Sequence, residues 1–152
     1  MRTQGSWVAS ANSADTDFPI ENLPFGRFIL AHDDNADPRV GVAIGDQILD
    51  CQALERSGCI PAEDAAFFAP LAAGDLNAFM ALGGHARRRV RDRLTALLSA
   101  EAKAKGMAIR LAGCLVPQSQ VEMLMPCRVG DYTDFYASIH HATAVGDRKS
   151  VV

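Results

Sequence analysis

The stretch RVGVAIGDQILD, residues 39–50, constrains the fold more than any other part of this chain. Apolar residues alternate with small ones from Val40 to Ile44, which is the period of a β-strand with two different faces. Gly45 and Asp46 stand where a two-residue hairpin turn belongs, and apolar residues resume just beyond them. We therefore predict two or three antiparallel strands between Gly26 and Leu49. Because an isolated hairpin is barely stable in water, we expect a small barrel or half-barrel to close them.

Helical patterns follow the hairpin. CQALERSGC predicts a short helix that ends at Gly58, and Asp75 is placed to cap a helix over Leu76–Leu82, with Gly83-Gly84 as its stop. HARRRVRDRLTALLSAEAKAKG, residues 85–106, predicts the longest helix, ending at Gly106. Its apolar stripe consists of Val90, Leu94, Leu97 and Leu98.

Composition narrows the class of protein. A length of 152 residues with 49% hydrophobic and 22% charged residues suits one globular domain with its own core. The net charge of -3 does not favour nucleic acid or an anionic membrane surface as a partner. No apolar run approaches the roughly 20 residues that span a bilayer. Residues 1–16 are small and polar and predict a loose leader without a signal-peptide core, so a cytoplasmic protein is expected.

The four cysteines lack metal-site spacing and are interpreted as buried thiols.

Two clusters of charged residues are interpreted as structural features with no catalytic or binding role. The basic run from Arg87 to Arg93 has no interleaved aromatic residue, so we predict a solvated helix face. HDDNADP, which begins at His32, lacks the glycine and the closing glutamate of a calcium loop and predicts a turn. His85 is interpreted as a surface residue.

GDYTDFYASIHHATAVG, residues 130–146, concentrates carboxylates, phenols and two adjacent histidines. Thr133 is placed to cap a helix that runs from Asp134 to Ala144. On such a helix Asp134 and His141 share a face about 10 Å apart, too far to bind one metal ion together. The spacing suits two roles, a metal carboxylate and an imidazole for proton transfer. A helix start that simply carries polar residues is the alternative, and the residues by themselves leave both open.

Four blocks, in this order, resemble the fumarylacetoacetase family: DFPIENLPFGRF, RVGVAIGDQILD, LNAFMALG and GDYTDFYASIHHATAVG. The resemblance implies an α+β or mainly β fold, with a small SH3-like N-terminal barrel and short helices followed by the truncated start of a mixed β catalytic domain. It implies hydrolysis of the carbon–carbon bond of 4-fumarylacetoacetate to fumarate and acetoacetate, in tyrosine and phenylalanine catabolism. The family enzyme is a homodimer.

Roles for three residues follow from the resemblance only. Asp134 corresponds to a ligand of the active-site Ca²⁺ or Mg²⁺, Tyr136 to a phenol that contacts substrate, and His141 to the general base that activates water. His140 stands where the family commonly has Gln, and Ala144 where it has Asn.

The resemblance also predicts the domain organisation. We expect a leader over 1–16, an SH3-like domain over 17–122, the start of a catalytic domain over 123–146 and a non-native tail over 147–152. The tail DRKSVV is the translation of GATCGGAAGAGCGTCGTG, which occurs in a common sequencing adapter with a stop codon after it. A chain of this extent is expected to be inactive alone, and its oligomeric state is open. The alternatives are a stand-alone SH3-like interaction module and another diketo-acid hydrolase of the wider superfamily.

Overall fold

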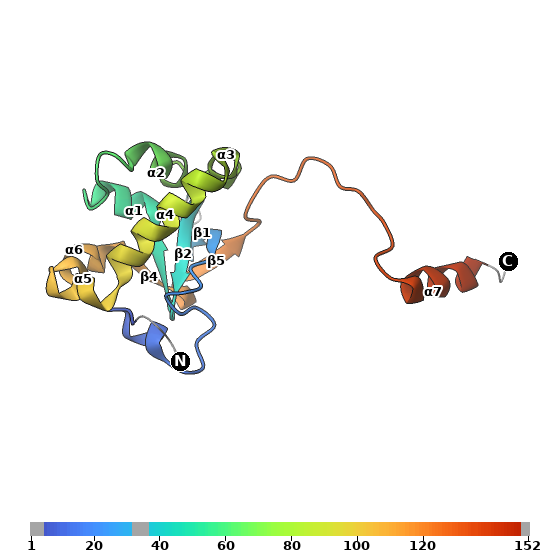
Figure 1. The fold of residues 1–152 in the computed structure, drawn as a ribbon, viewed down its shortest axis with the longest axis horizontal. Coiled ribbons are helices and arrows are strands. Elements are labelled where there is room, and N and C mark those ends of the chain that lie inside the picture. Colours follow the sequence, from blue (N-terminus) through green and yellow to red (C-terminus); the bar gives the residue numbers. More distant parts are fainter. Residues whose placement is uncertain (1–4, 32–36, 150–152) are drawn as a thin grey trace.

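The computed structural model describes residues 5–31 and 37–149 and has an α+β architecture (Figure 1). Its centre is a curled, antiparallel half-barrel of five strands in the order β4-β3-β2-β1-β5. The strands are β1 (Phe25–Leu30), β2 (Arg39–Ile44), β3 (Gln47–Asp50), β4 (Leu115–Pro117) and β5 (Val121–Leu124). The chain therefore returns from its helical part to add an edge strand on each side of the first three.

The predicted hairpin is confirmed. Ile44 pairs with Gln47, so Gly45 and Asp46 form the two-residue turn between β2 and β3. Gly45 has φ of +58°, a conformation that glycine adopts without strain. A Cβ at this position would lie only 2.5 Å from the backbone nitrogen of Ala11, so the turn also needs glycine for space.

The two faces of the sheet differ as the alternation predicted. Val40, Val42 and Ile44 are fully buried in the main hydrophobic cluster, which also contains residues of the helices. Gly41 and Ala43, which alternate with them, line an apolar cavity of about 280 Å³ on the other face. One face of the sheet thus supports the helices and the other forms a groove.

The helices lie along one side of the sheet (Figure 1). They are α1 (Cys51–Arg56), α2 (Ala65–Ala72), α3 (Leu76–Ala81), α4 (Gly83–Leu98), α5 (Ala100–Ala104) and α6 (Met107–Leu111). A further helix, α7 (Ile139–Lys149), lies away from the sheet, and 3-10 turns occur at Ala9–Asn12, Ala112–Cys114 and Gln118–Gln120. The caps at Gly58 and Asp75 are confirmed: Gly58 has φ of +65°, and the Asp75 carboxylate accepts hydrogen bonds from the N–H groups of Asn77 and Ala78. Within the described residues no helix has the length and apolar character needed to cross a membrane.

The predicted single helix over residues 85–106 is wrong at Ser99. Its apolar stripe is buried as expected, but Ser99 is extended, with ψ of 153°, and separates α4 from α5. The Ser99 hydroxyl accepts a hydrogen bond from the N–H of Ala102, so it caps the new helix. Serine is a strong cap and a weak interior residue, and here the tertiary contacts select its capping role.

The prediction of a loose leader is wrong for residues 5–12. Val8 and Ala11 are buried, and the Trp7 ring N–H donates to the carbonyl of Leu97 at 2.8 Å. The hydroxyl of Ser6 donates to the carbonyl of Leu98 at 2.7 Å. The small residues that looked unstructured are the ones that fit closely against the end of α4.

The basic run is only partly solvated, contrary to prediction, because two of its arginines form ion pairs. Arg89 and Arg93 both bind the carboxylate of Asp64, whose side chain is 1% exposed. The guanidinium of Arg91 donates to the carbonyl of Leu23 and lies over the ring of Phe25. The exposed part of α4 therefore carries an ionic contact to the loop before α2 as well as solvated charge.

Two elements of the structure run across predicted boundaries. β5 spans the expected domain boundary between residues 122 and 123, so Met123 and Leu124 belong to the sheet. α7 continues across the expected start of the tail as far as Lys149. Within the predicted leader, turn and tail, residues 1–4, 32–36 and 150–152 lie outside the described residues. Cys51, Cys59 and Cys114 are buried free thiols, as predicted, whereas the thiol of Cys127 is only half-buried, so the prediction is wrong for that residue.

Candidate active-site segment

The candidate catalytic residues lie in one segment, residues 129–149, which extends away from the rest of the chain (Figure 1). We call residues 5–31 and 37–128 the body and residues 129–149 the segment. The segment has no regular structure until α7 begins at Ile139. Its large apolar side chains are exposed, with Phe135 at 73% and Ile139 at 78%.

The predicted helix start at Asp134 is wrong by five residues. The hydroxyl of Ser138, in place of Thr133, accepts the N–H of His140 at 3.2 Å, and the carbonyl of Ser138 accepts the N–H of Ala142. Short helices are marginal in water without an apolar face to bury. Residues 134–138 lack such burial and stay outside the helix.

The structure brings two of the three predicted site residues together. The rings of Tyr136 and His141 contact each other edge to face, with centroids 5.1 Å apart and an interplanar angle of 82°. Asp134 lies outside α7 and so does not share a helix face with His141. All three side chains are exposed to solvent.

The described residues do not form a complete metal site. Ca²⁺ takes six to eight oxygen ligands, and Mg²⁺ demands a near-octahedral set. Among the residues described, no group of three or more His, Cys, Asp or Glu side chains is placed to hold a metal ion. Asp134 supplies a single carboxylate, so the segment alone does not fit either ion.

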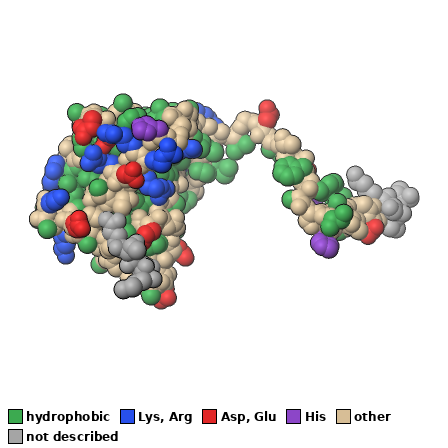
Figure 2. All heavy atoms as spheres, in the orientation of Figure 1, with side chains coloured by type: hydrophobic (Ala, Val, Ile, Leu, Met, Phe, Trp, Pro, Cys, Tyr) green, Lys and Arg blue, Asp and Glu red, His purple; other side chains and the backbone are tan. Residues whose placement is uncertain are grey.

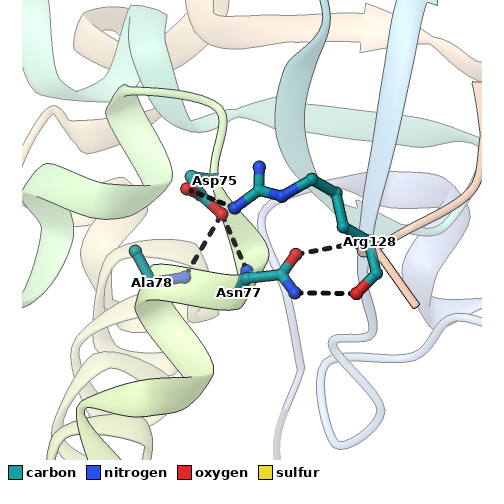
Figure 3. A network of polar contacts seen from close by, with 4 residues as sticks. All are labelled: Asp75, Asn77, Ala78 and Arg128. Carbon is teal, nitrogen blue, oxygen red and sulfur yellow. Dashed lines mark hydrogen bonds and ion pairs between the residues drawn. The ribbon is translucent and has the colours of Figure 1, made fainter. Parts of the chain in front are cut away.

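A polar network joins the end of the body to α3 (Figure 3). The side-chain amide of Asn77 pairs with the backbone of Arg128, and the Arg128 guanidinium lies 3.4 Å from the Asp75 carboxylate. Sequence reasoning identified Asp75 as a helix cap but missed Asn77 and Arg128. They are 51 residues apart, and no local pattern signals such a contact.

The groove on the open face of the sheet is apolar, and none of the described residues that line it has a titratable side chain. Aromatic and aliphatic residues such as Phe28, Ile48 and Met123 line it. Figure 2 shows hydrophobic side chains gathered where the chain leaves the body, and Met123 and Met125 are 58% and 67% exposed.

A family model described as fumarylacetoacetase N-terminal matches residues 21–126, which include the whole five-stranded sheet. The chain belongs to this family. The family match covers the body from residue 21 to residue 126 and includes neither residues 5–20 nor the segment.

Curated fumarylacetoacetases are similar over a longer stretch. The chain is 40% identical to that of Bos taurus over 141 residues, 41% identical to that of Homo sapiens over 136 residues and 43% identical to that of Caenorhabditis elegans over 133 residues. Each comparison covers 87% of this chain and 31% of the relative, so the chain spans about a third of the length of these relatives. A stretch that covers 87% of the 152 residues is longer than 126 residues, so wherever it begins it must end after residue 126. The similarity to the relatives therefore extends past the end of the family match.

Proposed function

We propose that this chain is the N-terminal part of a fumarylacetoacetase that hydrolyses the carbon–carbon bond of 4-fumarylacetoacetate to fumarate and acetoacetate. This reaction belongs to tyrosine and phenylalanine catabolism. One observation carries the proposal: about 40% identity to curated fumarylacetoacetases over 87% of the chain, together with a family match to the body. The coverage of 31% of each relative supports a chain that is inactive without further sequence.

In the proposed reaction His141 acts as the general base. The imidazole takes a proton from water, and the oxygen of that water adds to the carbonyl carbon at the fumaryl end of the diketone. The carbon–carbon bond then breaks, and its electron pair leaves with the acetoacetate half as an enolate, which takes up a proton. Histidine suits this role because its ordinary pKa lies close to neutral pH.

Tyr136 contacts the substrate in the proposed scheme and also orients the base. Its ring lies edge to face against His141, a geometry favoured by the charge distribution of aromatic rings. The contact supports a pair that works together, since one ring limits the orientations of the other.

A divalent ion, Ca²⁺ or Mg²⁺, is part of the proposal from the resemblance, with Asp134 as one of its ligands. When bound, such an ion polarises carbonyl oxygens of the diketone. Among the described residues no group of three or more possible ligands lies together there, so the remaining ligands would have to come from elsewhere.

The proposed organisation is an SH3-like N-terminal domain followed by the start of a mixed β catalytic domain. The curled antiparallel half-barrel supports the first part of this proposal. We place the boundary after β5 and not inside it, because β5 pairs with β1 along its whole length. Assembly as a homodimer and a cytoplasmic location stay predictions from the sequence.

A chimeric enzyme tests the proposed function. Residues 1–146 of this chain would replace the corresponding part of the Bos taurus fumarylacetoacetase, to which it is 40% identical. We expect the chimera to cleave 4-fumarylacetoacetate, measured by the loss of its ultraviolet absorbance, and His141→Gln to lower kcat by roughly 10²–10⁴-fold.

His140→Gln is the matched control because it changes the neighbouring imidazole in the same way. We expect it to retain activity. A folded chimera without activity, or equal losses in the two variants, would contradict the proposal.

A further inference from the structure

Arg128 is the last residue of the body, and α3 holds it by its main chain. The side-chain amide of Asn77 donates to the Arg128 carbonyl at 2.9 Å, and its oxygen accepts the Arg128 N–H, also at 2.9 Å. This two-way pairing reproduces the contact between neighbouring β-strands. A shift of the chain by one residue breaks both hydrogen bonds, so the contact selects one register.

Asp75 fixes Asn77 in the position that this pairing needs. One carboxylate oxygen of Asp75 accepts the N–H of Asn77 at 2.9 Å and that of Ala78 at 3.2 Å, which caps α3. The other oxygen faces the Arg128 guanidinium at 3.4 Å. The pKa of Asp75 is lowered, first by the hydrogen bond from Ala78 and then by the charge of Arg128. The same carboxylate therefore anchors the donor of the contact and attracts its target (Figure 3).

The contact lies at the point where body and segment meet. The β-pairing of the polypeptide ends at Leu124 of β5, four residues before Arg128. The hydrogen bonds described for residues 129–145 join neighbours within the segment, as those of Ser138 and Thr143 do. Arg128 is thus the last described residue that the body holds before Tyr136 and His141.

We propose that Asn77 is a positioning residue, which together with Asp75 holds Arg128 and so sets where the segment leaves the body. The inference rests on the proposed function, because that function makes the placement of Tyr136 and His141 matter. If the contact at Arg128 is lost, the last residue that the body fixes is Leu124 at the end of β5. Four further residues, 125–128, then become free to move, and the path of the segment is no longer defined by α3.

Amide hydrogen exchange in the full 152-residue chain tests this. Asn77→Ala removes both hydrogen bonds to Arg128. It does not weaken α3, because alanine is the best helix former. We expect the Arg128 amide to exchange roughly 5- to 30-fold faster, as the loss of one or two kcal/mol implies. The Phe79 amide, which donates to the Asp75 carbonyl within α3, should not change. Nitrogen-15 relaxation should place the end of chain order at Leu124 instead of Arg128.

Two further variants separate positioning from general stabilisation. Asn77→Asp keeps an oxygen that accepts the Arg128 N–H but cannot donate to its carbonyl, so this amide should remain protected. Asn22→Ala removes an exposed asparagine that donates to the Asp17 carbonyl elsewhere in the body, and should leave Arg128 unchanged. Unchanged exchange at Arg128 in Asn77→Ala, an equal increase in Asn22→Ala, or an unchanged end of chain order overturns the proposal. These readouts need no substrate, so they are independent of whether His141 is the base.

Discussion

The body and the segment contain the same kinds of side chains in opposite environments. In the body, Leu94 is fully buried and the carboxylate of Asp64 binds two arginines. In the segment, Phe135 is 73% exposed and Asp134 lies at the surface. Residue types that look catalytic therefore do not by themselves make a site. A site also needs neighbouring residues that hold the catalytic side chains in place. In this structure the side chains of the body have such neighbours.

The largest effect is expected in the core. Leu94→Ala should lower the free energy of unfolding by about 2–5 kcal/mol, because it removes buried methyl groups and leaves a cavity. Phe135→Ala removes a larger side chain from the segment and should change that free energy by less than about 0.5 kcal/mol. Urea unfolding of both variants measures the contrast. A comparable loss for Phe135→Ala would mean that the segment packs against the body in solution.

Asp64→Ala is expected to destabilise the body by about 1.5–3 kcal/mol, the range for hydrogen bonds to charged groups. Although Asp64 is buried, its partner Arg89 is 41% exposed, so the loss stays below the 3–5 kcal/mol typical of a broken, fully buried pair. Asp134→Ala is the matched control and should be neutral to stability. Equal midpoints for the two variants in urea would argue against a structural role for the Asp64 contact.

The same contact predicts a pH dependence. Burial acts to raise the pKa of Asp64, but the hydrogen bonds and charges of Arg89 and Arg93 outweigh it, so the pKa lies below its ordinary value. A carboxyl group with a lowered folded pKa contributes stability above its unfolded pKa, about 3.9, and loses it as the pH falls through the folded value. Acid unfolding should therefore be less pH-dependent below about pH 4 in Asp64→Asn than in the parent. Parallel stability curves would show that Asp64 does not contribute.

A smaller loss of stability is expected for a substitution in the groove on the open face of the sheet. A Cβ at Gly41 would clash with Ile48 and lie 2.8 Å from the ring of Phe28, so Gly41→Ala should cost about 1–3 kcal/mol. Gly113→Ala is a suitable control because a Cβ there has no neighbour within 4 Å. Thermal unfolding of both variants measures the difference, and similar melting temperatures would indicate a groove that adapts easily.

The smallest change in stability, less than about 0.5 kcal/mol, is expected for Tyr136→Ala in the segment. The substitution removes the ring that faces His141, so the proton resonances of the imidazole should shift while the unfolding midpoint stays constant. Nuclear magnetic resonance of the histidine ring protons checks this. Unchanged resonances would show that the two rings do not contact each other in solution.

Local patterns predicted the elements that depend on neighbouring residues. The alternation from Val40 to Ile44 identified a strand with two faces, and Asp75 was correctly identified as a cap. The apolar stripe of α4 identified its buried side. These signals succeed because a turn, a cap or an amphipathic face is decided within a few residues.

Errors arose where distant contacts decide the outcome. Ser99 interrupts the predicted helix because it caps α5 and forms a β-bridge with Ser6 near the N-terminus. Arg89 and Arg93 looked solvated because their partner, Asp64, is 25 and 29 residues away. The predicted helix start at Asp134 failed for the opposite reason, since no distant contact supports it.

The amino-acid sequence by itself determined the central hairpin, the capped helices and the family, and it singled out Asp134, Tyr136 and His141 by resemblance. Only the tertiary structure decided that β5 forms the edge strand beside β1 and that Asn77 holds Arg128. The physical reason is the range of the interactions. Backbone geometry and periodic burial act between near neighbours and can be recognised in the sequence. The pairing of an edge strand, or a hydrogen bond between residues 51 positions apart, forms only once the chain has folded.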